Sequence, residues 1–451
     1  MRPTPPPPTH PRPRPSAPRW AGGSLALLSL AACNSTATPN AGPLDAGQDA
    51  AQLPEDVGVD VATVDRVDVA TVDRVDVPAM PEAAIDVAPD LPVLPGDPRV
   101  VQLAVGTRHT CALQARGTVY CWGSNSNGQL GDGTTRTVRR APVRVMGVDD
   151  ATQIAAGQQF TCALRRDGTV LCWGANAEAQ MGDGARGADR PLPAPVAGVA
   201  EVTQLTAGAG HACALRRDAS VLCWGWNRFA QVGDGTEGGH RRAARVPGLT
   251  SVVQIDAGWS HTCARRSDGS VVCWGFNEAG QIGDGTRGDT ANRSSPTAVM
   301  GLRNALEVAA GATRSVARTA PDELWVWGRN EEPFRLDQPV PVPTRFGTFT
   351  GLAQLAPSAS FTCVRLESGR VQCWGRGDLG SLGNGNNRDQ VMPTEVAMLD
   401  DAVEIAAGDF HVCARRRGGS LVCWGSNSDG ALGSGTMEPR SLVPVAVLPM
   451  P

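Results

Sequence analysis

The dipeptide Trp-Gly occurs seven times in this chain of 451 residues, at intervals of 47 to 53 residues. Each copy stands in the same pattern of short apolar segments separated by glycine, Asp-Gly and proline, and no copy shows helical periodicity. A unit of about 50 residues with about four short strands is typical of one blade of a β-propeller. The pattern therefore predicts an all-β fold, a seven-bladed β-propeller, over residues 98–451. The repeated tryptophans are Trp122, Trp173, Trp224, Trp274, Trp327, Trp374 and Trp424.

The two ends of the repeat array indicate how the ring could close. The array begins with a segment typical of a first strand, residues 100–105, and ends with one typical of a last strand, residues 443–447. A closed ring protects the edges of its sheets. We therefore expect the two termini to pair with each other and close the propeller.

The best-preserved copy runs from Val253 to Thr286. It reads Ala-Gly, His-Thr-Cys-Ala, Asp-Gly, Cys-Trp-Gly and Gly-Gln-Ile-Gly-Asp-Gly-Thr in that order. This pattern resembles the regulator of chromosome condensation repeat, a family that forms seven-bladed propellers, and the resemblance covers roughly residues 98–450. Two copies depart from it: residues 331–336 replace the Gly-Asp-Gly segment in the fifth, and Ser358 replaces a glycine in the sixth.

Twelve of the 13 cysteines form pairs whose members are ten residues apart and flank a hairpin turn. Directly opposed residues of a hairpin have Cα atoms about 4.5–5.5 Å apart, within the range of a disulfide. We therefore predict six disulfides, formed in an oxidising compartment. The expected pairs are Cys111 with Cys121, Cys162 with Cys172, Cys213 with Cys223, Cys263 with Cys273, Cys363 with Cys373, and Cys413 with Cys423.

Free buried thiols, zinc sites and catalytic thiols are the alternatives to these disulfides. Free thiols would not need to vanish together, yet the fifth copy replaces both members of the pair with Val316 and Val326. Each hairpin offers two ligands where zinc needs four. The close spacing that is usual for thiol-exchange motifs is missing as well. The pattern favours disulfides over all three alternatives.

The N-terminus reads as an export signal. Residues 1–19 carry four arginines and no acidic residue, and an apolar stretch from Trp20 to Ala32 follows. It ends in Leu-Ala-Ala-Cys, which resembles the bacterial lipobox, where the cysteine is acylated after cleavage. The alternative is ordinary secretory cleavage with Cys33 incidental. We predict that residues 1–32 are a lipoprotein signal peptide, that Cys33 is lipidated, and that the protein is anchored in the cell envelope, at the outer membrane or cell surface.

Residues 33–97 have a different composition. They contain 13 acidic residues against Arg66 and Arg74, no aromatic residue, and a tandem eight-residue unit at 60–67 and 68–75. Alternating valines could form a strand, but the richness in proline, alanine and aspartate and the like charges favour an extended, solvated chain. The sequence predicts a disordered acidic linker, with the N-terminal lipid as the only contact with the membrane.

Two repeated polar positions are candidates for chemistry. Four copies share a histidine two residues before the first cysteine, at His109, His211, His261 and His411. Phe160, Arg314 and Phe361 occupy this position elsewhere, and the replacement by phenylalanine favours packing over metal binding. The aspartates of Gly-Asp-Gly offer one carboxylate per loop, too few for calcium, and are predicted to cap their own turns. The sequence contains no recognisable catalytic arrangement, so we expect no enzyme activity, no metal and no cofactor.

A contact surface is predicted from residues that break the repeat. Aromatic residues anchor interfaces, and the third and fourth copies carry extra ones in or near loops. Arginine clusters in variable loops are the second candidate, with simple solvation as the alternative. These residues are Trp226, Phe229, Trp259, Phe276, Arg139, Arg140, Arg241 and Arg242.

Charge excludes one class of partner. The net charge is −4, and residues 98–451 carry 35 arginines against 32 acidic residues, so we expect no nucleic acid. The sequence predicts a non-enzymatic module that binds a protein or surface glycan. The alternatives are an inhibitor of a secreted enzyme, since a bacterial β-lactamase-inhibiting protein resembles this fold, a hydrolase or lyase of the propeller funnel, and the nucleotide-exchange activity on a small GTPase that the family resemblance implies. The lipobox and the disulfides contradict the compartment of the last.

Overall fold

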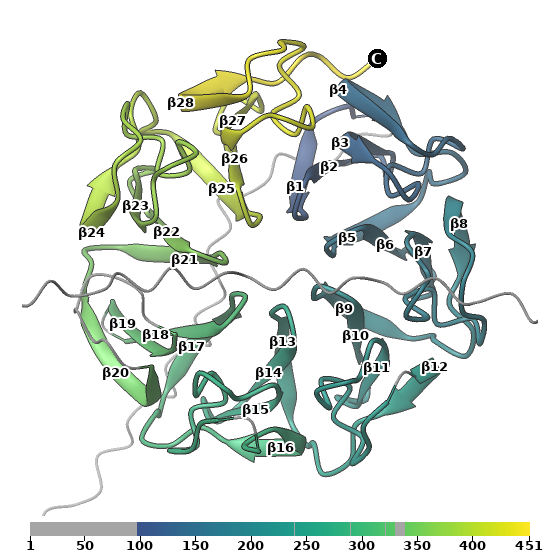
Figure 1. Ribbon diagram of the computed structural model, residues 1–451, viewed down its shortest axis with the longest axis vertical. Helices are drawn as coiled ribbons and strands as arrows, with labels where there is room; N and C mark the ends of the chain where they lie inside the picture. The colour runs from purple at the N-terminus through teal and green to yellow at the C-terminus, as the bar shows by residue number, and fades with distance from the viewer. Residues whose placement is uncertain (1–96, 239, 289, 321, 330–338) are drawn as a thin grey trace, which may run out of the picture. The chain divides into compact units, whose positions relative to one another are not determined.

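The computed structural model describes residues 97–451 except 239, 289, 321 and 330–338. The predicted signal peptide, Cys33 and nearly all of the linker lie outside the described residues. Seven four-stranded antiparallel sheets follow one another around a ring, each built from four consecutive strands with the first nearest the axis (Figure 1). The predicted all-β, seven-bladed propeller is confirmed.

The strands of blades one to four are β1 (Val100–Val105), β2 (His109–Gln114), β3 (Val119–Asn125), β4 (Thr137–Arg144); β5 (Ala151–Ala156), β6 (Phe160–Arg165), β7 (Val170–Gly174), β8 (Arg190–Pro195); β9 (Val202–Ala207), β10 (His211–Arg216), β11 (Val221–Gly225), β12 (His240–Arg245); and β13 (Val252–Ala257), β14 (His261–Arg266), β15 (Val271–Gly275), β16 (Arg293–Ala298). Those of blades five to seven are β17 (Ala305–Ala310), β18 (Arg314–Thr319), β19 (Glu323–Gly328), β20 (Val340–Thr348); β21 (Leu352–Pro357), β22 (Phe361–Leu366), β23 (Val371–Gly375), β24 (Gln390–Glu395); and β25 (Ala402–Ala407), β26 (His411–Arg416), β27 (Leu421–Ser426), β28 (Arg440–Ala446).

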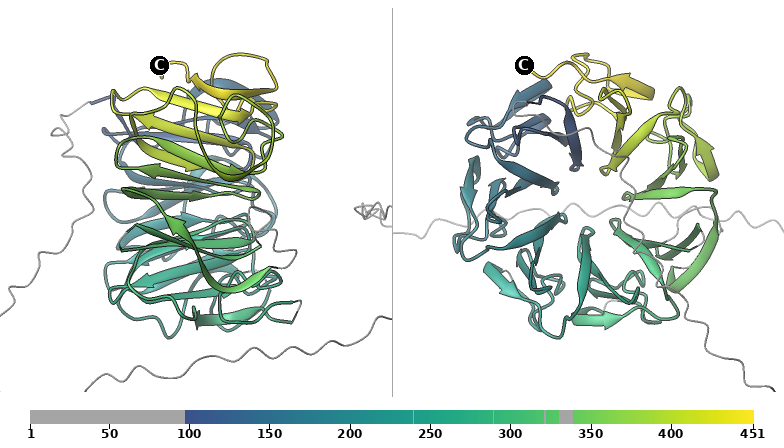
Figure 2. Two further views of the ribbon diagram at one scale, coloured as in Figure 1. Left: turned by 90° about the vertical axis from the view of Figure 1, so that its left-hand side faces the viewer. Right: turned by 180° about the vertical axis from the view of Figure 1, so that it is seen from behind.

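The antiparallel order gives the ring two distinct faces (Figure 2). In each blade, the turn between the first two strands and the loop between the last two lie at one end of the strands. The hairpin turn between the two middle strands lies at the other end. We call the two sides of the ring the loop face and the hairpin face. In blade four the loop face carries residues 258–260, 276–288 and 290–292, and the hairpin face carries residues 267–270.

The core is divided among the joints between blades. Each cluster of buried apolar side chains joins two neighbouring blades, and the cluster between blades seven and one contains Leu103, Trp122 and Leu432. Every repeated tryptophan side chain is buried. The indole Nε1 of six of them donates to a backbone carbonyl of the preceding blade, as Trp173 does to Gln129 O at 2.9 Å. The tryptophans therefore hold adjacent blades together.

The glycine of each Trp-Gly is fixed by backbone geometry. Gly275 has a φ of +104°, which side-chain-bearing residues rarely adopt. A Cβ there would lie 2.6 Å from the carbonyl oxygen of Ser260. Glycine stands at this position in all seven blades because the strand there makes a bulge that leaves no room for a side chain.

A belt of amide side chains joins the inner strands. Gln204 Nε2 donates to Ile255 O of the next blade at 3.1 Å, and Ile255 N donates back to Gln204 Oε1 at 2.8 Å. In blades five and seven a glutamate takes this position, and each accepts one backbone N–H from the next blade. The other residues that make the paired contact are Gln102, Gln153, Gln254 and Gln354.

The expected pairing of the two termini is wrong, because β1 lies in a sheet with β2–β4 and β28 in a sheet with β25–β27. Blades seven and one are instead joined by the contacts that join the other blades. Leu103 N donates to Glu404 Oε1 at 2.9 Å, and Trp122 Nε1 donates to Ala431 O at 2.8 Å. The ring closes by side-chain packing without a shared sheet.

Candidate functional site

Each of the six expected cysteine pairs is bonded in the structure, and all twelve side chains are fully buried. The partners face each other directly in the hairpin register, whereas Val316 and Val326 occupy the same opposed positions in blade five. The disulfides therefore reinforce individual blades and leave the joints between blades to other contacts. The bonds join Cys111 to Cys121, Cys162 to Cys172, Cys213 to Cys223, Cys263 to Cys273, Cys363 to Cys373, and Cys413 to Cys423.

The repeated histidines lie in the joints between blades. His211 Nε2 lies 2.9 Å from Thr262 Oγ1 of the next blade, and that hydroxyl donates to Gln231 O at 3.0 Å. Because the hydroxyl proton is committed to the carbonyl, the imidazole must donate through Nε2. Burial lowers the pKa of His211 to about 3, so the ring is neutral.

The residue that this repeat position contacts in the next blade depends on which side chain stands at the position. His109, His261 and His411 likewise contact a threonine or serine hydroxyl of the next blade. Phe160 and Phe361 instead pack in apolar clusters that include Ala212 and Val412 respectively. Polar joints pair a histidine with a hydroxyl, and apolar joints pair a phenylalanine with an aliphatic residue. In blade five Arg314 takes the position and donates from Nη1 to Thr362 Oγ1 of the next blade at 3.3 Å. The position is therefore structural in each form. Among the described residues, no group of three or more His, Cys, Asp and Glu side chains could hold a metal ion.

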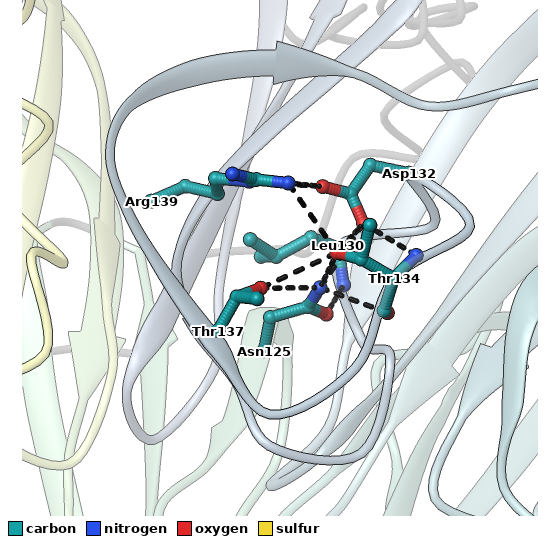
Figure 3. A network of polar contacts seen from close by, with 6 residues as sticks. All are labelled: Asn125, Leu130, Asp132, Thr134, Thr137 and Arg139. Carbon is teal, nitrogen blue, oxygen red and sulfur yellow. Dashed lines mark hydrogen bonds and ion pairs between the residues drawn. The ribbon is translucent and has the colours of Figure 1, made fainter.

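The Gly-Asp-Gly aspartates cap their own turns, and some also bind an arginine (Figure 3). Asp132 Oδ1 accepts from Thr134 N at 3.0 Å and Thr134 Oγ1 at 2.6 Å, and Arg139 Nε donates to Asp132 Oδ2 at 3.0 Å. Burial opposes ionisation here, but the hydrogen bonds from Thr134 and Arg139 keep the pKa of Asp132 below its usual value. Arg139, predicted for a contact surface, is thus a residue of β4 that clamps its own loop.

The other arginines of the predicted surface also lie in strands, and their assignment to loops is wrong. Arg140 lies in β4, where its carbonyl oxygen accepts from Gly435 N of blade seven at 2.9 Å. Arg241 and Arg242 lie in β12, and Arg242 forms an isolated bridge with Asp183 of blade two. Arg139, Arg140, Arg241 and Arg242 therefore belong to outer strands and not to the variable loops.

Three of the four aromatic residues form a cluster on the loop face, between blades three and four. The rings of Trp226 and Phe229 lie 5.4 Å apart and meet edge to face, and those of Phe229 and Phe276 lie 4.6 Å apart. All three side chains are half-buried or more. The guanidinium of Arg228, which is exposed, lies 5.8 Å from the Phe229 centroid. We call Trp226, Arg228, Phe229 and Phe276 the aromatic cluster.

Trp259, the fourth aromatic residue, lies at the loop-face end of the ring axis and lines a cavity there. Its Nε1 donates to Asp409 Oδ1 at 2.8 Å, which joins blade four to blade seven across the ring. Thr107 Oγ1 donates to Asp409 Oδ2 at 2.6 Å, and burial raises the pKa of Asp409. A cavity of about 90 Å³ lies here among the ends of the seven inner strands. No sequence pattern points to Asp409, because its partners lie far from it along the chain.

Comparison with known proteins relates most of the array to one group of propellers. The family model of the RCC1-like domain matches residues 78–338, and those of the regulator of chromosome condensation repeat match residues 368–415 and 402–431. The ultraviolet-B receptor UVR8 of Arabidopsis thaliana is 28% identical over 312 residues, which cover 67% of this chain and 58% of UVR8. The probable E3 ubiquitin-protein ligase HERC6 of Homo sapiens is 32% identical over 143 residues, 30% of this chain and 14% of HERC6. The chain thus spans less than two thirds of these relatives.

Solved structures show the same fold. Prp20p of Saccharomyces cerevisiae, whose binding to Gsp1p and histones has been described, superposes with a TM-score of 0.66 at 22% identity. That match covers 75% of this chain and 87% of Prp20p. Human WBSCR16 superposes with a TM-score of 0.66 at 24% identity, with coverage of 74% and 94%. At these identities the likeness concerns the fold alone.

Proposed function

The chain belongs to the family of RCC1-like domains, and we propose that it is an exported, non-enzymatic member that binds a protein partner through the aromatic cluster on its loop face. RCC1-like propellers are generally binders or exchange factors rather than catalysts. This proposal assigns the predicted binding role to one place, the loop-face side of the joint between blades three and four. The aromatic cluster is the observation that carries it.

The aromatic cluster has the composition of an interface anchor. Trp226, Phe229 and Phe276 place apolar rings in loops where most other blades have polar or small residues, so they are not needed for the repeat itself. Arg228 adds an exposed cation beside them. Tryptophan and arginine are enriched among residues that dominate binding energy. Partly buried rings that meet edge to face favour a protein over a glycan, because they present no single flat, open ring.

The disulfides indicate the compartment in which the protein would meet its partner. Six disulfides indicate an extracytoplasmic protein, since thiols stay reduced in the cytosol. Among the residues that the structure describes, no helix is long and apolar enough to span a membrane. We propose that a lipid on Cys33 anchors the protein and that residues 33–97 hold the propeller away from the membrane. This compartment argues against nucleotide exchange on chromatin. Inhibition of a secreted enzyme would use the same aromatic cluster.

The partner test compares two truncations of apolar side chains on opposite faces. We expect Phe229→Ala/Phe276→Ala to weaken capture of one defined envelope or secreted protein by a factor of about 30 or more, which corresponds to about 2 kcal/mol. Met398→Ala, an exposed methionine on the hairpin face, serves as the control and should bind normally. Surface plasmon resonance with the full-length protein measures both. Equal affinity of the double variant and the wild type would reject the aromatic cluster as the binding surface.

Lipidation is tested separately by mass spectrometry of the protein produced in a bacterium. We expect the mature chain to begin at Cys33 with the added mass of a lipid and to fractionate with membranes. Cys33→Ser should remain unlipidated and lose that association. A soluble wild-type chain with an unmodified Cys33 would contradict the anchor, and it would leave the aromatic cluster as a separate question.

A further inference from the structure

All seven blades line the small cavity at the loop-face end of the ring axis, which we call the axial cavity. Its volume is about 90 Å³, which is space for several groups of the size of a water molecule. Each blade contributes two or three consecutive residues, most of them glycine or alanine. Asp409 is the only charged residue of this lining. A ligand in the axial cavity would therefore meet one acidic group in otherwise uncharged surroundings.

The axial cavity is narrow because glycines stand in the first turns of the blades. A Cβ at Gly258 would lie 2.1 Å from the carbonyl oxygen of Gly311 in the next blade, and a Cβ at Gly208 would lie 2.2 Å from the carbonyl oxygen of Gly258. In blade six Ser358 takes this position, and its Oγ donates to Gly408 O at 2.6 Å. Neighbouring blades thus meet main chain to main chain around the axis, with carbonyl oxygens among the atoms of this narrow ring.

Neutral donors hold the carboxylate of Asp409 at the axial cavity. Trp259 of blade four donates from Nε1 to Oδ1 at 2.8 Å, and Thr107 of blade one donates from Oγ1 to Oδ2 at 2.6 Å. All three residues line the axial cavity. A carboxylate can accept about four hydrogen bonds, so both oxygens of Asp409 keep the capacity to accept another donor.

The negative charge of Asp409 is not balanced by a paired cation. The residue is 7% exposed, and within the described part of the chain it forms no ion pair. Burial raises the pKa of Asp409, and the hydrogen bonds from Thr107 and Trp259 and the charge of Arg108 offset this effect only in part. Arg108 itself lies 3.3 Å from Asp429. Because a buried carboxylate is costly without a cation, a cationic ligand would stabilise this arrangement.

We propose that the axial cavity binds a primary ammonium group, which donates hydrogen bonds to Asp409 and balances its charge. An ammonium group is a compact cation with three donors and no acceptor, which suits a small cavity that holds one carboxylate. The chain contains no lysine, so the group would come from a free amine or from a lysine of another protein. Trp259 is 38% exposed, so the axial cavity adjoins the outer surface. The site does not depend on the aromatic cluster.

The test uses ethylammonium as the free amine and Nα-acetyl-lysine methylamide as the lysine side chain. Isothermal titration calorimetry of the full-length protein at fixed ionic strength is expected to show saturable binding of at least one of them, with a Kd below about 10 mM. The probe that binds more tightly distinguishes the two sources. Tetramethylammonium carries the same charge without an N–H donor. We expect it to bind at least about tenfold more weakly, a difference of about 1.4 kcal/mol.

Two variants of Asp409 test the carboxylate. Asp409→Ala copies the alanine that blades three, five and six have at this position, so the fold should tolerate it. We expect it to bind the ammonium probe about tenfold more weakly or worse. Asp409→Asn keeps the size of the side chain and removes its charge, and it is expected to weaken binding in the same direction even if the alanine variant fails to fold.

The matched control is Asp378→Ala, which removes an exposed carboxylate from a loop on the same face of blade six. Asp378 lies 3.3 Å from Arg376 and does not line the axial cavity, so this variant should bind like the wild type. Three results would overturn the site. They are no saturable binding of either ammonium probe up to about 10 mM, equal affinity in the wild type and the Asp409 variants, and binding of tetramethylammonium as tight as that of the primary amines.

Discussion

Denaturing the protein in the presence of dithiothreitol is expected to yield a chain that no longer returns to the propeller. Each disulfide closes a hairpin loop whose ends are ten residues apart. In the chain-entropy model such a loop contributes about 2–3 kcal/mol. Six of them together are comparable with the whole stability of a typical domain, about 5–15 kcal/mol. Refolding by dilution, followed by tryptophan fluorescence, measures the effect.

The control for this experiment is the native protein incubated with the same reductant but without denaturant. Because all twelve disulfide-bonded cysteine side chains are fully buried, the native protein should keep its fluorescence. A second experiment removes a single disulfide by replacing one cysteine pair with valines, the residues that blade five has at these positions. Cys263→Val/Cys273→Val should lower the free energy of unfolding by up to about 3 kcal/mol. Full refolding of the reduced chain would show that the disulfides are dispensable.

Acidification is expected to unfold the propeller between about pH 6.5 and pH 3, and the repeated histidines should drive it. Burial lowers the pKa of His109 to about 4 and of His211, His261 and His411 to about 3, from an ordinary value of 6.5. The unfolded chain therefore takes up protons first as pH falls. Their contribution to stability is fully present above about pH 6.5, and each histidine removes about 1.4 kcal/mol per pH unit below that.

Four buried carboxyl groups act in the opposite direction, because burial raises the pKa of Asp256 to about 6 and of Glu307 to about 7 and also raises the pKa of Glu404 and Asp409. The folded protein holds their protons more tightly and gains stability as pH falls. We expect the histidines to outweigh these acids, because three of the four have a pKa lowered from 6.5 to about 3. The net effect is a loss of stability in acid.

One double variant separates the effect of histidine protonation from the other causes of unfolding in acid. His211→Phe/Thr262→Ala copies the apolar joint that Phe160 and Ala212 form between blades two and three. We expect this variant to unfold at a lower pH than the wild type in an acid titration followed by circular dichroism. At pH 8 its free energy of unfolding should change by only about 2 kcal/mol, because the two hydrogen bonds of the Thr262 hydroxyl are exchanged for packing. An unchanged acid midpoint would remove the histidines as the cause.

The fold could be predicted because its signals are local and repeated. Asp-Gly turns, the cysteine spacing and Trp-Gly each recur at one place in a blade, so seven copies specify the unit. Closure of the ring could not be predicted, because identical repeats do not show whether a sheet shares strands from both termini. The pattern predicts a loop at Arg139 because β4 is an outer strand with no apolar alternation. The contact between Trp259 and Asp409 depends on the ring itself, which brings distant blades together.

The joint between blades seven and one has a consequence for the order of the chain. It uses tryptophan, belt and histidine contacts of the kinds found at other joints, and no sheet crosses it among the described strands. The chain passes from one blade to the next at six of the seven joints, and the seventh joint, between blades seven and one, is held by the same kinds of contact. Any of the seven joints could therefore lack the chain connection. We expect circularly permuted chains, with their ends at another joint, to form the same ring.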